Sequence, residues 1–212
     1  MPVQQGFRKL FAYFQLFTVY AFIECALWSS AASVRNHWAG IAAIAVAAFL
    51  LLDRPSLRRL GLGTPNANAI RLVLTLSLLA AALLILSVLS LGGQIDARAV
   101  LLNLSRSGGY VIWAAVQEFL LQSFFFTRCE DLVGSSTAVW AAATMFANAH
   151  LPNPFLTAFS LAGGLFFCEM FRRYRSLYPL MLGHALLGLT IAITMPDSLM
   201  HHMRAGIGYL QY

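Results

Sequence analysis

The chain has 212 residues, of which 59% are hydrophobic and only 10% are charged, and its mean hydropathy is +0.72. Soluble domains are about 25% charged, because a surface that faces water needs polar groups. A soluble fold is therefore excluded, whereas a chain whose outer surface contacts hydrocarbon needs few charges. The formal net charge of +6 arises from short basic clusters between apolar runs, a pattern typical of membrane topology signals and not of nucleic-acid binding.

The apolar runs are long and continuous, which predicts helices that cross a membrane and disfavours the alternating pattern of a β-barrel. We expect an all-α polytopic bundle of about seven transmembrane helices, within a range of six to eight, that forms a single membrane domain over residues 1–212. The predicted spans are roughly 10–30, 38–52, 70–92, 108–127, 134–150, 155–171 and 177–195. The second span is short and is expected to be tilted or extended. The fifth and sixth spans should form a tight antiparallel pair, because only residues 151–154 separate them.

The first predicted span has a feature of secretory signal peptides. It follows Arg8 and Lys9 and precedes the small residues Ser30, Ala31 and Ala32, which resemble a cleavage site. Its apolar region, however, is longer than the about 7–15 residues usual for a signal peptide. We therefore favour an uncleaved first helix.

Basic residues are distributed unequally between the two ends of the predicted spans. The positive-inside rule assigns the more basic side to the cytoplasm, which predicts a cytoplasmic N-terminus and an outer C-terminus. The predicted inner residues are Arg8, Lys9, Arg54, Arg58, Arg59, Arg71, Arg128, Arg172, Arg173 and Arg175. The predicted outer residues are Arg35, Arg98, Arg106 and Arg204.

The cysteines give no sign of a disulfide framework or a zinc site. Cys25, Cys129 and Cys168 are far apart in the sequence and form no C-x-x-C pair. We expect no metal and no cofactor.

Ionisable side chains inside the predicted spans need an explanation, because a charge at the bilayer centre costs about 2.5–3.5 kcal/mol on translocon scales. Glu118 lies near the middle of its span, and Gln122 lies one helical turn further, so both should face one direction. Glu118 is either a buried carboxyl that fixes packing or part of a functional site. The polar residues considered are Glu24, Gln117, Glu118, Gln122, His150, Glu169 and His184.

Several of these residues also have ordinary structural roles. His150 ends a predicted helix, where a histidine interacts favourably with the helix dipole. His184 lies inside the last predicted span, where an interhelical hydrogen bond is its ordinary role. Glu169 is close to Arg172 and Arg173, so an ion pair explains its position.

Together, Glu118, His150 and His184 provide a carboxylate and two imidazoles on three helices. A carboxylate and an imidazole can hold and deprotonate a water molecule, and a second imidazole can donate to an oxyanion. The same three groups can bind zinc, although no H-E-x-x-H segment accompanies them. A hydrolytic site is the main prediction. A transporter or proton relay is an alternative that the lack of an internal repeat disfavours.

Three short motifs occur in order along these helices. Residues 117–122 read Gln-Glu-Phe-Leu-Leu-Gln, residues 146–150 read Phe-Ala-Asn-Ala-His, and residues 184–188 read His-Ala-Leu-Leu-Gly. They resemble the Glu-Glu-x-x-x-Arg, Phe-x-x-x-His and His-x-x-x-Asn/Asp motifs of the bacterial CPBP family of CAAX proteases and bacteriocin-processing proteins. The resemblance covers the predicted catalytic core, residues 108–195.

The resemblance implies an intramembrane endopeptidase of the glutamate type in a bacterial plasma membrane. Glu118 and His150 would activate water, His184 would stabilise the oxyanion, and Phe146 would support the second motif. The expected partners are membrane lipid and a membrane-associated peptide or protein substrate. No nucleic-acid partner is expected.

Three positions depart from the family pattern. Gln117 replaces the first Glu, Gln122 replaces the Arg, and Gly188 replaces the Asn. Glutamine cannot act as a general base, so Glu118 has to serve or the site is inactive. The loss of one oxyanion donor typically costs about 2.7–4 kcal/mol. A non-catalytic binding or self-immunity protein on the same scaffold is therefore the alternative function.

The expected depths of the three residues in the membrane differ. Glu118 lies near mid-depth, His184 toward the inner side, and His150 near the outer end of its span. They can meet only if the turn at Pro152 and Pro154 dips into the membrane or the helix ends shift. Non-helical backbone at that depth has to be buried in protein or line a water-filled cavity.

Overall fold

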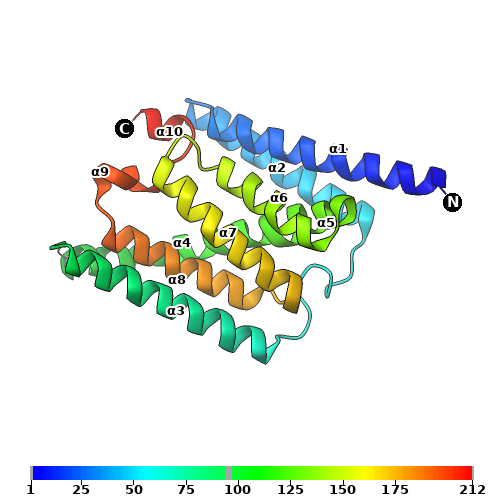
Figure 1. The fold of residues 1–212 in the computed structure, drawn as a ribbon. Helices are drawn as coiled ribbons and strands as arrows, with labels where there is room; N and C mark the ends of the chain where they lie inside the picture. Colours follow the sequence, from blue (N-terminus) through cyan, green and yellow to red (C-terminus); the bar gives the residue numbers. More distant parts are fainter. Residues whose placement is uncertain (1, 94–96, 212) are drawn as a thin grey trace.

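The computed structural model describes residues 2–93 and 97–211, with side chains for residues 6–93 and 108–211 (Figure 1). The regular structure of the described residues is helical and includes no strand, which confirms the predicted all-α fold. The elements are α1 (Pro2–Leu27), α2 (Ala32–Asp53), α3 (Ala67–Ser90), α4 (Ala97–Glu118), η1 (Phe119–Phe126), α5 (Thr127–Val133), α6 (Ser135–Asn148), α7 (Pro154–Tyr174), α8 (Tyr178–Thr194), α9 (Asp197–Met200), η2 (His201–Met203) and α10 (Ile207–Leu210).

Among the described residues, four helices are long and apolar enough to cross a membrane, namely α1 from Gly6 onward, α2, α3 and α7. A fifth candidate arises if α8 and the segment Asp197–Met203, which are bent by 120°, are counted as one span. Helices occupy all seven predicted ranges. The helix α6 has only 14 residues, fewer than the about 17 that a full crossing needs. Length and composition alone therefore identify four or five of the predicted spans.

Two helical segments differ in extent from the prediction. The helix α2 has 22 residues and begins at Ala32, because the mostly polar residues 33–37 continue the helix instead of preceding it. The predicted span 108–127 is the middle of a longer stretch formed by α4, η1 and α5. Within this stretch, η1 is a π-helix of 8 residues. Widened helical turns of this kind occur frequently at functional sites.

Neighbouring helices pack closely through small residues. The helices α6 and α7 run side by side (Figure 1). Gly164 of α7 lies against Ala143 of α6, where a Cβ on Gly164 would be 3.2 Å from the Ala143 Cα. Between α3 and α8, a Cβ on Gly183 would be 2.8 Å from the Ser77 hydroxyl oxygen. Such close approach of backbones is the usual way in which membrane helices gain packing contacts.

The hydrophobic core surrounds η1. Phe124 and Phe126 are completely buried in it. The Phe124 ring lies 6.4 Å from the Phe49 ring of α2, and the Phe126 ring meets the Phe171 ring of α7 edge-on at 5.6 Å. Because η1 runs through the interior, the residue that precedes it, Glu118, is also placed inside the bundle.

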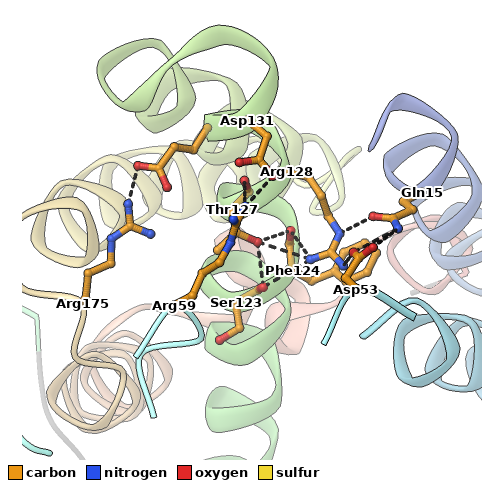
Figure 2. Close-up of polar contacts among 10 residues, drawn as sticks. Gln15, Asp53, Arg59, Ser123, Phe124, Thr127, Arg128, Asp131 and Arg175 are labelled. Atoms are coloured by element: carbon orange, nitrogen blue, oxygen red, sulfur yellow. Dashed lines mark hydrogen bonds and ion pairs between the residues drawn. The ribbon is translucent and has the colours of Figure 1, made fainter. Parts of the chain in front are cut away.

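At one end of the bundle, Arg128 joins three helical segments (Figure 2). Its Nε donates to Gln15 Oε1 over 2.8 Å, and its Nη2 donates to Asp53 Oδ2 over 2.9 Å. Its guanidinium also stacks on Phe124, 3.8 Å from the ring centroid. These bonds tie α5 to α1 and to the end of α2, and they give the buried cation the partners that its removal from water requires.

Two further ion pairs lie at this end, between Arg59 and Asp131 and between Arg175 and Glu130 (Figure 2). The N-terminus of α1 is at the same end of the bundle, and the C-terminus of the chain is at the opposite end (Figure 1). This arrangement agrees with termini on opposite sides of a membrane.

The predicted pairing of Glu169 is confirmed. Arg172 Nε and Arg173 Nε lie 2.7 Å and 2.5 Å from its two carboxylate oxygens. The side chains of Arg98 and Arg106, two of the predicted outer residues, lie outside the described residues. The cytoplasmic location of the N-terminus stays a prediction.

Candidate functional site

Glu118 is the last residue of α4 and is completely buried. Gln122, on the next turn, is also completely buried, and its Nε2 donates to Glu118 Oε2 over 3.1 Å. The shared orientation expected from their spacing is therefore confirmed. The family motif has an arginine at this position, which would bring a positive charge as well as a hydrogen bond. Gln122 supplies the hydrogen bond without the charge.

The second oxygen of Glu118 contacts His184 across the packing of α4 against α8. Glu118 Oε1 is 2.9 Å from His184 Nδ1. The His184 ring is parallel to the Phe167 ring at 5.9 Å, and the Phe146 ring meets it edge-on at 6.0 Å. The carboxylate and the two aromatic rings together hold the imidazole in one orientation, as a preorganised site requires.

His150 lies in the turn that follows α6. Its Nδ1 is 2.7 Å from the Phe146 carbonyl oxygen, and its ring packs against the Phe146 ring with centroids 4.7 Å apart. The bond to the last turn of α6 agrees with the structural role expected for a histidine at a helix C-terminus. Phe146 therefore positions both histidines, since its ring also contacts His184.

The partners of the two imidazoles determine their tautomers. We assign the ring hydrogen of both His150 and His184 to Nδ1, where it is donated to the Phe146 carbonyl oxygen and to the Glu118 carboxylate oxygen. In a neutral imidazole the remaining nitrogen, Nε2, is then an acceptor. Both histidines therefore present Nε2 as a hydrogen-bond acceptor, and a neutral His184 has no Nε2 hydrogen to donate.

A cavity of about 780 Å³ lies beside the two histidines. Its lining includes five residues of the three motifs, namely Gln117, Phe146, His150, His184 and Gly188. Glu118 and Gln122 are not among the lining residues, and Glu118 reaches the cavity only through its bond to His184. The pairing expected from the motifs, Glu118 with His150, thus differs from the observed one, Glu118 with His184.

A second cavity of about 300 Å³ adjoins the first. Five residues line both cavities, namely Trp113, Gln117, Phe146, His150 and Met203. Gln117 and His150 therefore stand between a space bordered by α1 and a larger space bordered by α3 and α8.

The turn between α6 and α7 explains how His150 reaches the cavity. At 1.5 Å per residue, α6 is about 21 Å long, which is shorter than a hydrocarbon core of about 30 Å. The C-terminal segment covers the turn, because Asn153 Nδ2 donates to the Met200 carbonyl over 2.9 Å and Gly206 N donates to the Leu151 carbonyl over 2.7 Å. The buried Asn153 and these two bonds therefore hold the turn against the C-terminal segment.

Tyr110, which lines the larger cavity, belongs to none of the three sequence motifs. It lies on α4, two turns before Gln117, and its hydroxyl lies against Gly188. A tyrosine in an apolar helix is ordinarily a packing residue, so its position in the sequence carries no signal of this placement.

Among the described residues, no group of three or more His, Cys, Asp and Glu side chains has the arrangement of a metal site. A zinc ion held by Glu118, His150 and His184 would need a free carboxylate oxygen directed at it. Both oxygens of Glu118 are bonded instead to His184 and Gln122.

Residues 99–190 match the sequence model of a known family, described as type II CAAX prenyl endopeptidase Rce1-like. The matched segment contains all three motifs, and the match confirms the family resemblance inferred from them. No curated protein and no solved structure gives a significant match to the chain.

Proposed function

We propose that this chain, whose residues 99–190 match the Rce1-like family, is an intramembrane endopeptidase that hydrolyses a peptide bond of a membrane-associated peptide or protein. One observation carries the proposal for this site. The buried Glu118 carboxylate is bonded at 2.9 Å to His184, and His184 lines a large cavity. A carboxylate in this position orients a histidine and stabilises its protonated form in many hydrolases.

In the proposed mechanism His184 is the general base. Glu118 holds its Nδ1 hydrogen, so Nε2 takes a proton from water, and the carboxylate stabilises the imidazolium that forms. The resulting hydroxide attacks the peptide carbonyl carbon. The imidazolium then returns the proton to the leaving amine nitrogen as the carbon–nitrogen bond breaks. This role replaces the oxyanion role that the motif implies, because a neutral His184 has no Nε2 hydrogen.

His150 and Gln117 complete the proposed site. His150 accepts the second hydrogen of the attacking water at Nε2 and thereby orients the nucleophile. Gln117 cannot take a proton, but its amide N–H group can donate to the oxygen of the tetrahedral intermediate. The departure at position 117 is thus compatible with catalysis if a histidine, and not a carboxylate, is the base.

The substrate to test first follows from the family and from the cavity. The lining is mostly apolar, with leucine, phenylalanine, isoleucine and alanine side chains of α3, α7 and α8. An apolar wall favours a lipid-modified or hydrophobic peptide over a charged one. The name of the matched family adds a prenylated CAAX peptide as the specific class.

The test is hydrolysis of internally quenched peptides by the protein in proteoliposomes, with a panel that carries either a farnesylated or an unmodified cysteine near the C-terminus. We expect wild-type hydrolysis and a loss of at least about 100-fold in kcat for His184→Ala and for His150→Ala, because general acid–base groups contribute about 10²–10⁴-fold. His37→Ala is the matched control, since His37 is exposed on α2. Hydrolysis by His184→Ala at the wild-type rate contradicts the mechanism, and no hydrolysis of any peptide by the wild type contradicts the function.

A non-catalytic peptide-binding protein is the second candidate. The observation in its favour is that neither Asp nor Glu occurs among the residues that line the two cavities beside the histidines. In that case the bond between Glu118 and His184 serves stability alone. The wild type and His184→Ala would then bind the farnesylated peptide with equal affinity, and mass spectrometry would recover it intact.

A further inference from the structure

Tyr110 fills the space that a side chain at position 188 would occupy. A Cβ built on Gly188 would overlap the Tyr110 hydroxyl oxygen and would lie 2.6 Å from its Cζ and 3.0 Å from its Cε1. Gly188 is buried on α8, and Tyr110 belongs to α4. A larger residue at position 188 would therefore require the phenol to move.

This contact brings the phenol hydroxyl close to His184. Gly188 follows His184 by one helical turn, so the two positions share a face of α8 and are about 5–6 Å apart. Tyr110, Gly188 and His184 all line the 780 Å³ cavity. The hydroxyl consequently lies where the family motif carries the side chain of an Asn or Asp.

We propose that Tyr110 is a catalytic residue of this site, whose hydroxyl donates a hydrogen bond to the carbonyl oxygen of the scissile peptide. The inference rests on the proposed peptidase function. It assigns to α4 the oxyanion donor that the change to Gly188 removed from α8. It also explains why position 188 is a glycine and not the Asn or Asp of the motif, because a side chain there would overlap the Tyr110 phenol.

The chemistry of a phenol suits this role. Its O–H is a donor that stays protonated near neutral pH, and the bond strengthens as the carbonyl oxygen gains negative charge. No proton has to leave Tyr110, so no bond at this residue is formed or broken during the reaction. Packing alone does not require the hydroxyl, since a phenylalanine would supply the same ring.

The first experiment removes the hydroxyl and keeps the ring. In the proteoliposome assay, Tyr110→Phe should lower kcat about 100- to 1000-fold with KM changed less than about threefold, as for the loss of one oxyanion donor. Its midpoint of thermal unfolding should stay at the wild-type value. Tyr178→Phe is the matched control, because the Tyr178 hydroxyl donates to the Leu62 carbonyl and Tyr178 lines neither cavity. This control should keep the wild-type kcat.

The second experiment returns the donor to α8. Tyr110→Ala opens the space beside position 188, and adding Gly188→Asn places an amide donor there. The double variant should recover at least about tenfold in kcat over Tyr110→Ala alone. Gly188→Asn with Tyr110 present should instead unfold at a lower temperature, because the new side chain overlaps the phenol.

The outcomes separate the two proposals. If Tyr110→Phe hydrolyses peptide at the wild-type rate while His184→Ala is inactive, the role of Tyr110 is refuted and the peptidase function stands. If Tyr110→Phe loses activity and thermal stability together and the double variant recovers nothing, Tyr110 is a packing residue and the inference is again refuted. If neither the wild type nor any variant hydrolyses the peptides, the peptidase function fails and the inference fails with it.

Discussion

Replacing Glu118 by glutamine removes one negative charge from a completely buried position and hardly changes the side-chain volume. In the wild type, Oε1 lies 2.9 Å from His184 Nδ1 and Oε2 accepts from Gln122 Nε2 over 3.1 Å. A glutamine offers one acceptor oxygen and one donor amide, so it can satisfy only one of these two donors. The variant therefore leaves one buried hydrogen-bond donor unpaired.

The catalytic loss in Glu118→Gln follows from the missing charge. An imidazolium on His184 and the carboxylate, with charge centres about 4 Å apart, attract one another by about 4 kcal/mol at an effective dielectric constant of about 20. Because each 1.36 kcal/mol corresponds to about tenfold in rate, we expect kcat to fall about 1000-fold. The unpaired donor should lower the free energy of unfolding by about 1–3 kcal/mol.

The assay is peptide hydrolysis in proteoliposomes, with thermal unfolding measured on the same preparations. Glu169→Gln is the matched control, because the Glu169 carboxylate is bonded to Arg172 and Arg173 and does not line the cavity. This control should retain the wild-type kcat. A Glu118→Gln protein that hydrolyses peptide at the wild-type rate would refute the assignment of Glu118 as the residue that activates His184.

Three further perturbations test other parts of the structure. Arg128→Met should lower the free energy of unfolding by about 3 kcal/mol. This is the lower end for a broken buried ion pair, because the partner Asp53 is 35% exposed. A change below about 1 kcal/mol in denaturant titrations would contradict this expectation. In intact cells without the native cysteines, an impermeant maleimide should label Ser30→Cys and not Arg173→Cys, and the reverse pattern would overturn the predicted topology. Gln117→Glu should lower kcat about 100- to 1000-fold, because a carboxylate on the cavity wall cannot donate to the oxyanion, and an unchanged or higher kcat would refute the donor role of the Gln117 amide.

Composition and local spacing were sufficient to predict the helical membrane fold and the short-range contacts. A chain with 10% charged residues cannot present a soluble surface, so its apolar runs become helices. Glu118 and Gln122 are bonded because positions four apart share a helix face. The same rule predicted that Glu169 would pair with Arg172 and Arg173. In each case the partner is fixed by helical geometry within a few residues.

The three motifs also predicted which residues gather around the cavity, but not how they are connected. Glu118 was expected to act with His150, yet its carboxylate contacts His184, 66 residues away. That contact depends on the packing of α4 against α8, and spacing along the chain does not specify which helix faces meet. The tautomers of the two histidines, and hence their chemical roles, follow from these partners.

Tertiary structure alone decided three further features of the site. The turn that carries His150 is held in place by the C-terminal segment, which bonds to it through Asn153 and Gly206. Tyr110 reaches Gly188 because α4 and α8 lie in contact, and nothing in either local sequence records this fit. The cavity itself is bordered by helices distant in the sequence. The amino-acid sequence determines that the helices lie in a membrane and which residues of one helix share a face. Side-chain complementarity between distant helices determines which groups share the cavity.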